Sequence, residues 1–207
     1  MPAGCLLLAC LSCGKGNGEW EAELTSKDPF VRGMAAIGLG LQAPEHARVA
    51  LPVLLATIDR SDLGLERPAA QVLSHVGPFE VPFLLDELVA DELMSLDRKG
   101  AIMNALLNGG GQGAQAIVEC LRGKGMHLVG DLGDVLLSIG DPALPAMADL
   151  LQGGTDARLQ SFGAFLLGKY GPRARAALPA LQAAAKSPDA ALQETAQRAI
   201  AAIQGGN

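Results

Sequence analysis

Apolar residues recur along most of this chain at intervals of three and four positions, which is the spacing of one face of an α-helix. Segments with this pattern run over 31–40, 66–77, 97–107, 127–140, 157–168 and 188–203. Each of them except the last is followed by a second apolar stretch with helical spacing. The pattern therefore predicts short helices in pairs, followed by one unpaired helix.

The second stretch of a pair often starts with an aliphatic residue followed by proline, at Pro52, Pro82, Pro145 and Pro179. Pro52 and Pro82 are 30 residues apart, and Pro145 and Pro179 are 34 apart. The 63 residues from Pro82 to Pro145 leave room for one degenerate copy around 116–118. Five copies at a period near 31 to 34 residues indicate an internal repeat.

Capping residues and glycines mark the predicted helix ends. Asp28, Asp141 and Ser187 each precede a proline, so each is predicted to cap a helix that begins at that proline. Glycine is common directly after a helix. It occurs here at the predicted ends Gly40, Gly77, Gly140 and Gly171.

The stretches Asp28-Pro29-Phe30-Val31-Arg32 to Ala35-Ala36 and Gly171-Pro172-Arg173-Ala174-Arg175 to Leu181 resemble HEAT repeats of the short bacterial type found in bilin-lyase-like proteins. The resemblance covers about residues 20 to 204 and weakens in the third and fourth copies. Tetratricopeptide repeats have a similar length, but their tryptophan and tyrosine positions are unoccupied here. The resemblance implies an all-α fold: a right-handed α-solenoid (superhelix) of about five two-helix repeats plus a terminal capping helix.

Composition supports helices, since 49% of residues are hydrophobic but only 3% are aromatic, and strands favour aromatic and β-branched residues. Small residues are expected where paired helices approach closely, at Ala35, Ala36, Ala69, Ala70, Gly163 and Ala164. Leucines are expected to fill the layer between helices, at Leu39, Leu73, Leu106, Leu136 and Leu166. Trp20 and Leu24 are predicted to lie on one face of a short helix that covers the first repeat.

The N-terminus suggests a membrane tether. Leu7-Leu8-Ala9-Cys10 is similar to a bacterial lipobox, and the glycines that follow it would form a flexible tether. Residues 1–18 are therefore expected to be a signal and tether segment ahead of a repeat domain over 19–207. Cys10 is the expected lipidation site and Cys13 the second choice. No Lys or Arg precedes the apolar run, so an unprocessed tail is the alternative. Cys10-Leu11-Ser12-Cys13 is also a CxxC, but no second ligand pair accompanies it for zinc.

The formal charge of −6 and a pI of 5.0 argue against nucleic acid as a partner. The charge is unevenly spread, and two groups of residues are candidate protein-binding surfaces. The acidic group comprises Glu80, Asp86, Glu87, Asp91 and Glu92, within a stretch that continues to Asp97. The basic group comprises Arg158, Lys169, Arg173 and Arg175.

The sequence offers little for catalysis. His46, His75 and His127 fall in three different repeats, and none is followed by Glu, whereas deoxyhypusine hydroxylases, an enzyme family built from these repeats, hold iron with His-Glu pairs. Cys120 is expected to be a buried structural cysteine, and Gly109 to Gly113 a flexible loop between helices. No catalytic, cofactor-binding or metal-binding residue is therefore predicted.

These observations predict a non-catalytic, monomeric scaffold that binds another protein and no cofactor. It would be held at the bacterial cell envelope by a lipidated cysteine, or lie in the cytoplasm if the N-terminus is not processed. Two enzymatic alternatives stay open at this point. The first is a bilin-lyase-like enzyme or maturation factor, and the second, less favoured, is an oxidoreductase similar to deoxyhypusine hydroxylase.

Overall fold

The computed structural model describes residues 15–42, 47–123, 125–152 and 156–205. Throughout these ranges the regular structure is α-helix and short 3₁₀-helix, without β-strand. The chain divides into two compact units, which meet in sequence at Asn108 and Gly109. The prediction of an all-α, helical-repeat fold is confirmed, while a right-handed superhelix stays a prediction.

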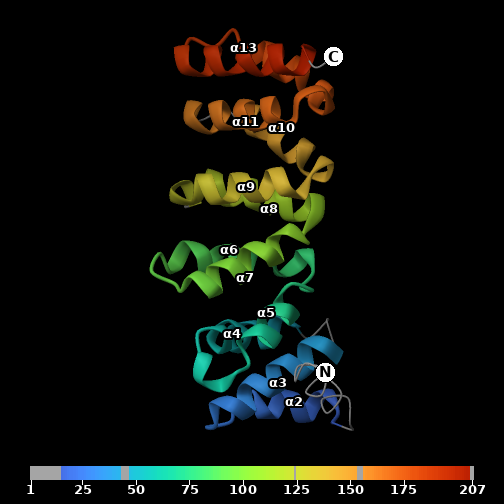
Figure 1. Ribbon diagram of the computed structural model, residues 1–207. Coiled ribbons are helices and arrows are strands. Elements are labelled where there is room, and N and C mark those ends of the chain that lie inside the picture. Colours follow the sequence, from blue (N-terminus) through green and yellow to red (C-terminus); the bar gives the residue numbers. More distant parts are fainter. Residues whose placement is uncertain (1–14, 43–46, 124, 153–155, 206–207) are drawn as a thin grey trace. The chain divides into compact units, whose positions relative to one another are not determined.

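The first unit holds α2 (Asn17–Glu23), α3 (Pro29–Gln42), α4 (Ala47–Ile58), α5 (Glu66–Leu73), α6 (Val81–Ala90) and α7 (Leu96–Leu107) (Figure 1). Single 3₁₀ turns at Ser61–Leu63 and Pro78–Glu80 precede α5 and α6. Helix α3 packs on α4 and α5, and α5 packs on α7. The first helices of successive predicted pairs therefore lie side by side.

The second unit holds α8 (Gly110–Arg122), α9 (Val129–Ile139), α10 (Leu144–Gln152), α11 (Ala157–Tyr170), α12 (Leu178–Ala184) and α13 (Ala190–Gln204). Three 3₁₀ segments connect them, at Gly125–Leu128, Asp141–Ala143 and Gly171–Ala177. Helices α9, α11 and α13 pack in succession, and so do α8, α10 and α12 (Figure 1). Two parallel rows of helices with one pair per step are the arrangement of a helical repeat.

The predicted leucine layer is confirmed. Leu39, Leu73, Leu106 and Leu136 are fully buried, and Leu166 is 1% exposed. The alanines expected at close contacts, Ala35, Ala36, Ala69 and Ala164, are also fully buried. Ala70 is an exception, because it is only half-buried and lines a surface groove between α5 and α7.

Glycines set the spacing between several neighbouring helices. A Cβ atom added to Gly163 in α11 would lie 2.7 Å from the Cβ of Leu150 in α10. One added to Gly168 would lie 3.1 Å from the Cα of Ala199 in α13. Helix α11 therefore approaches both neighbours at positions that have no side chain.

Trp20 closes the N-terminal end of the first unit, as predicted. Its side chain is 5% exposed and lies against Gly38 of α3, where an added Cβ would come within 2.9 Å of the indole ring. Leu24, on the same face of α2, is 8% exposed. A buried aromatic side chain removes roughly 150–250 Å² from water, which at about 25 cal/mol/Å² corresponds to at most about 4–6 kcal/mol.

Several predicted helix ends are confirmed. The Asp28 carboxylate accepts a hydrogen bond from the Phe30 N–H at 2.9 Å, ahead of a helix that begins at Pro29. Gly140 and Gly171 follow α9 and α11 with φ angles of +87° and +56°, which favour glycine. Three of the four predicted prolines stand at the second residue of their helix, namely Pro82, Pro145 and Pro179.

Other predicted ends were wrong. Helix α3 continues through Gly40 to Gln42, because Gly40 gives space to Val72 of α5 and does not end the helix. Helix α13 begins at Ala190, and Asp189, not Ser187, caps it by accepting from the Leu192 N–H at 2.9 Å. Pro52 lies inside α4, which begins at Ala47.

Further corrections concern Asp141 and the glycine run. Asp141 does not cap a helix, since it begins a 3₁₀ turn and its carboxylate pairs with Arg173. The glycines after Asn108 form no inter-helix loop, because α8 begins at Gly110. Gly111 lies against the Pro142 carbonyl, where an added Cβ would be 3.1 Å from the oxygen. Close packing therefore overrides the low helix propensity of glycine there.

None of the described helices has the length and apolar character needed to cross a bilayer. Cys10, Cys13 and His46 lie outside the described residues.

Candidate functional site

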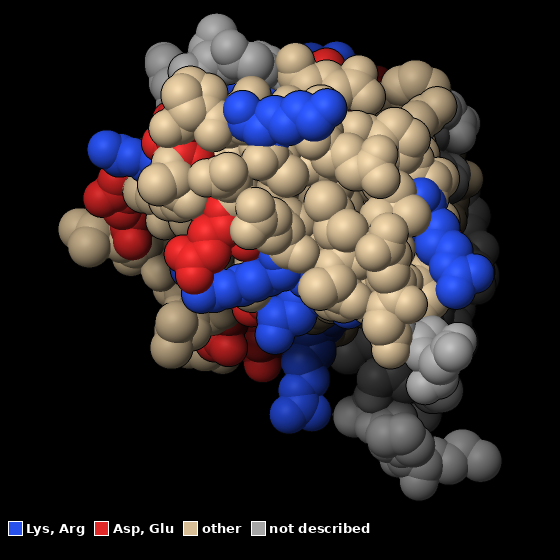
Figure 2. Space-filling view, turned by 90° about the horizontal axis from the view of Figure 1, so that it is seen from above, with Lys and Arg blue, Asp and Glu red and all other residues tan. Residues whose placement is uncertain are grey.

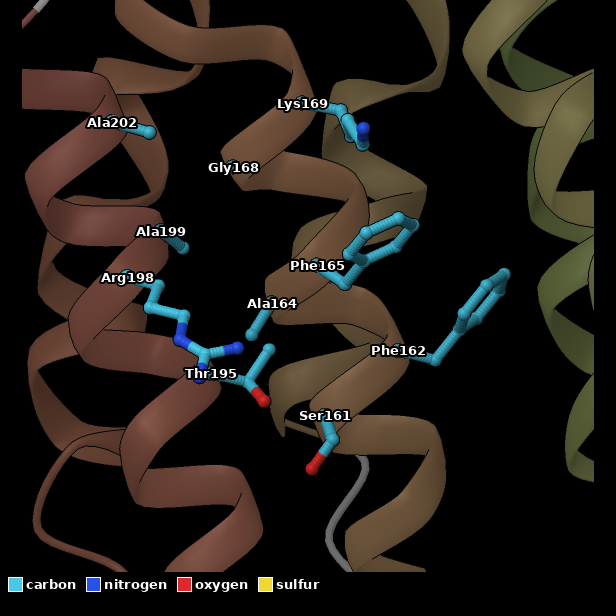
Figure 3. A pocket seen from close by; sticks show the side chains of 10 residues that line it. All are labelled: Ser161, Phe162, Ala164, Phe165, Gly168, Lys169, Thr195, Arg198, Ala199 and Ala202. Carbon is cyan, nitrogen blue, oxygen red and sulfur yellow. The ribbon is translucent and has the colours of Figure 1, made fainter.

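A groove runs along the surface of the second unit between α11 and α13, and we call it the α11–α13 groove (Figure 3). Its volume is about 420 Å³. Small residues of both helices line it, namely Ala164 and Gly168 from α11 and Ala199 and Ala202 from α13. The groove exists because these residues bring the two helices together without filling the space above them.

Larger side chains form the rim of the α11–α13 groove. Phe165 stands on α11 with 48% of its surface exposed. The Lys169 ammonium lies 5.3 Å from the centre of the Phe165 ring, within the range of a cation–π interaction. Figure 3 shows both side chains together on α11, while Arg198 extends from α13.

The polar groups of the groove differ in how strongly they are engaged. The Thr195 hydroxyl donates to the Ala191 carbonyl at 2.8 Å and is satisfied within its own helix. Arg198 pairs with Glu194 one turn earlier on α13, but both side chains are largely exposed, at 74% and 63%. An exposed pair of this kind contributes little, so the Arg198 guanidinium is available to a ligand at low cost.

The surface around this end of the second unit is mainly uncharged. Figure 2 shows the C-terminal end of the structure, where tan residues cover most of the surface and Lys and Arg are scattered over it, some of them beside Asp and Glu. On α13 the exposed side chains are mostly alanine and glutamine, including Ala191, Gln193, Gln197 and Ala201. Basic side chains beside weakly polar surface would favour a partner that carries carboxylates and apolar groups.

The structure brings only part of the predicted basic group into the groove. Lys169 lines it, but Arg173 pairs with Asp141 and lies 5.5 Å from the centre of the Tyr170 ring. Arg158 and Arg175 are exposed and do not line the groove. The groove therefore shares a single residue with the predicted basic group.

Sequence reasoning missed Phe165 and Arg198 as site residues. Phe165 lies on the exposed face of α11, whereas its sequence neighbours Ala164 and Leu166 lie on the buried face. An aromatic residue at an exposed position of an amphipathic helix is the signal that could have identified it. Arg198 belongs to α13, which the sequence predicted only as a terminal capping helix.

Some members of the predicted acidic group form ion pairs within the first unit. Arg98, just beyond the acidic stretch, donates from its guanidinium to Glu87 and lies 3.9 Å from an oxygen of Asp91. The same guanidinium lies 3.5 Å from Asp59 at the end of α4. Asp86 and Glu92 are exposed and Glu80 is half-buried. The five acids thus form no continuous unpaired surface.

The described histidines and Cys120 do not line the α11–α13 groove. His75 lies in the turn after α5, where its ring nitrogen is 2.7 Å from the carbonyl oxygen of Gln71 in that helix, and His127 is exposed in the second unit. The part of the chain that the structure describes contains no group of three His, Cys, Asp or Glu residues arranged to hold a metal ion. Cys120 is half-buried, where a fully buried side chain had been predicted, and it lies against Gly125.

Tyr170 joins α11 to α9 near the Arg173–Asp141 pair. Its hydroxyl donates to the Leu137 carbonyl at 3.0 Å. Burial raises the pKa of Tyr170 above its ordinary value, and Asp141 acts in the same direction, whereas Arg173 lowers it. The residue holds two helices together and does not line the α11–α13 groove.

Comparisons with known proteins show limited similarity. No family model and no curated protein matches this chain. Among solved structures, human deoxyhypusine hydroxylase in complex with glycerol is 19% identical, with 96% of this chain and 88% of that chain covered and a TM-score of 0.43. A designed armadillo repeat protein is 14% identical, with 91% and 100% covered and a TM-score of 0.36.

Proposed function

We propose that this protein is a non-catalytic helical-repeat scaffold whose α11–α13 groove binds another protein. The observation that carries the proposal is the half-exposed Phe165 with Lys169 on its ring, in a groove that Arg198 lines from the neighbouring helix α13. A partner segment with an apolar side chain and flanking carboxylates matches this surface. The apolar side chain would enter the groove against Phe165, and the carboxylates would meet the two cations.

The size of the groove suits a short segment of a partner. A volume of about 420 Å³ accommodates a few side chains, and exposed aromatic and arginine residues are common centres of binding energy at interfaces. Lys169 already lies on the Phe165 ring, so a carboxylate that binds Lys169 would be held beside the aromatic contact. Charge and shape thus select for the same acidic and apolar segment.

Selection of peptides from a displayed random library on the immobilised full chain tests this function. We expect the enriched sequences to combine an apolar residue with Asp or Glu on either side. Their affinity should fall at least about tenfold with Phe165→Ser and with the double change Lys169→Glu plus Arg198→Glu, since contacts of this kind are each worth about 1–2 kcal/mol. Arg158→Glu is the matched control, because Arg158 is an exposed base outside the groove.

Two results would contradict the proposed function. Enriched peptides without an acidic and apolar pattern would show that the groove has another specificity. Peptides that bind Phe165→Ser and the parent chain equally would show that binding occurs elsewhere.

We further propose that a lipid on Cys10 holds this scaffold at the bacterial cell envelope. The proposal is supported by the sequence Leu7-Leu8-Ala9-Cys10 and the glycine-rich segment after it. Intact-mass measurement of protein made in a bacterium should show loss of the first nine residues and an acyl mass on Cys10. Cys10→Ser should abolish the change, whereas modification that persists in Cys10→Ser and disappears in Cys13→Ser would assign the lipid to Cys13. A full-length, unmodified chain would refute the tether and favour the cytoplasm.

A further inference from the structure

One segment of the first unit has the chemistry expected of a ligand for the α11–α13 groove. It comprises residues 91–97, from the end of α6 to the start of α7, and we call it the α6–α7 segment. Figure 1 shows the connection between these two helices projecting from the side of the first unit. Leu93 is 95% exposed and Leu96 is 87% exposed, the two highest values among the described large hydrophobic residues. Glu92 precedes the first leucine, Asp97 follows the second, and both acids are exposed.

Local hydrogen bonds order the backbone of the α6–α7 segment. The Asp91 carboxylate accepts from the Leu93 N–H at 3.2 Å, and the Asp91 carbonyl accepts from the Met94 N–H at 3.3 Å. Ser95 caps α7 by accepting from the Arg98 N–H at 3.1 Å. A segment that is ordered before it binds loses less conformational entropy on binding.

The two leucines contribute little to the core of their own unit. Single exposed apolar residues are common on protein surfaces, but exposed apolar residues with charged neighbours on both sides are typical of interaction sites. Leu93 and Leu96 are removed from water only when another surface covers them. The α6–α7 segment is therefore suited to contact with a second molecule.

The α11–α13 groove complements this segment in both apolar character and charge. The groove presents the half-exposed Phe165 together with Lys169 and Arg198. A leucine of the segment would pack against the Phe165 ring, and the flanking carboxylates would meet the two cations. The acidic and apolar partner segment that the groove calls for is thus displayed by this chain itself.

Charge also favours a contact between the first unit of one copy and the second unit of another. The first unit carries 14 acidic and 8 basic residues, whereas the second carries 8 of each. Two first units would repel each other, and a first unit would not be repelled by a second unit in this way. The arrangement expected from charge is therefore heterologous, with different surfaces of the two copies in contact.

We propose that the α11–α13 groove binds the α6–α7 segment of a second copy of this chain. The inference rests on the proposed function, because it names the partner of the same groove. Each copy carries one groove and one segment, so the contact joins copies head to tail and can add further copies at either end. This equilibrium between single chains and short oligomers differs from the monomer predicted from the sequence.

Sedimentation equilibrium of the full chain at concentrations up to millimolar tests this inference. We expect the average mass to rise with concentration, and weakly so, because a groove and one short segment form a small interface. Leu93→Ser and Phe165→Ser should each weaken association by at least about tenfold, since apolar and aromatic anchors supply most of the binding energy at interfaces. Phe79→Ser is the matched control and should leave association unchanged, because Phe79 is 82% exposed in the same unit but lies outside the segment.

A mixture of two variants tests the head-to-tail contact directly. The Phe165→Ser chain keeps an intact segment, and the Leu93→Ser chain keeps an intact groove. Each variant alone should stay monomeric where the parent chain associates, whereas their equimolar mixture should form dimers and nothing larger. A mixture that stays monomeric would overturn the inference, as would association that is unchanged in Leu93→Ser.

Failure of this inference and failure of the proposed function give different results. If the chain stays monomeric at every concentration while selected peptides still depend on Phe165, the partner is another protein and the inference alone is overturned. If neither the peptides nor a second copy depends on Phe165, the groove is not a binding site and both proposals are overturned.

Discussion

The guanidinium of Arg98 on α7 donates a hydrogen bond to the carboxylate of Glu87 on α6. The Arg98 side chain is only 17% exposed, and it also faces Asp59 and Asp91. Ser95 caps α7 by accepting from the Arg98 N–H at 3.1 Å, and its hydroxyl donates to Asp59. One arginine thus neutralises acids from the ends of α4 and α6 and joins them to the start of α7.

Replacement of this arginine should destabilise the protein. We expect Arg98→Met to lower the free energy of unfolding by about 1–3 kcal/mol, because three carboxylates would then face one another without a cation. Urea unfolding at low ionic strength measures the loss, which should shrink in high salt as the repulsion is screened. Arg60→Met, which removes a fully exposed pair with Asp62, is the control and should leave the unfolding midpoint unchanged. A salt-independent loss in Arg98→Met would contradict this electrostatic explanation.

The same glycine-to-alanine change should have opposite effects at two positions of the first unit. Gly38→Ala should destabilise by about 1–3 kcal/mol, since the added methyl would push the Trp20 ring from its site. Gly100→Ala, inside α7 with open space around it, should stabilise by about 0.5–1 kcal/mol. Trp20 is the single tryptophan, so a red shift of its fluorescence should accompany Gly38→Ala alone. Equal effects of the two changes would mean that Trp20 does not rest on Gly38.

Ionisation of Tyr170 should lower the stability of the folded protein in alkaline solution. Burial raises its pKa in the folded state above the ordinary 10.0, so the unfolded chain loses its phenolic proton first as the pH rises. The stability that depends on the neutral phenol is complete below pH 10.0 and is lost as the pH rises through the folded pKa. Phenolate absorbance reports this residue directly, because it is the single tyrosine.

Tyr170→Phe provides the control for this titration. The variant should lack the phenolate signal and lose less stability above pH 10.0 than the parent chain. If folded Tyr170 titrated at or below its ordinary pKa, or if both proteins lost stability in parallel, the predicted coupling would be absent.

Two residues before α13, Ser187 and Asp189, could cap this helix, and substitutions distinguish between them. Asp189→Ala should destabilise by about 1 kcal/mol, because the Leu192 N–H would lose its acceptor, whereas Asp189→Asn should retain most of the stability. Ser187→Ala should have the smaller effect, since the Ser187 hydroxyl accepts from Asp189 N–H, ahead of the helix. Thermal unfolding measures all three variants. A larger loss for Ser187→Ala would restore the assignment of Ser187 as the cap.

Periodicity predicted the fold well because burial depends on spacing within single helices. Leu39, Leu106 and Leu136 stand where an apolar stripe must face a neighbouring helix, and all three are fully buried. The start of α8 was not predicted, because its glycines gain their stability from contact with a distant segment at Pro142. Local propensity contains no information on such a contact.

The candidate sites were harder to predict than the fold. Glu87 belongs to an acidic run in sequence, but the turn before α7 brings Arg98 back onto it. The two grooves arise from the approach of α5 to α7 and of α11 to α13, which no single helix specifies. Phe165 therefore acquires significance only when the neighbouring helix α13 is in place.

The close seams of α11 also bear on amide hydrogen exchange. Glycine amides in loops exchange quickly, and a chain with 26 glycines invites the expectation of rapid exchange throughout. Gly163 instead lies buried in mid-helix against Leu150, with no room for even a methyl group. Its amide can exchange only when α10 and α11 separate, so it should be among the slowest of the second unit. In this protein some glycines mark the most tightly closed parts of the backbone.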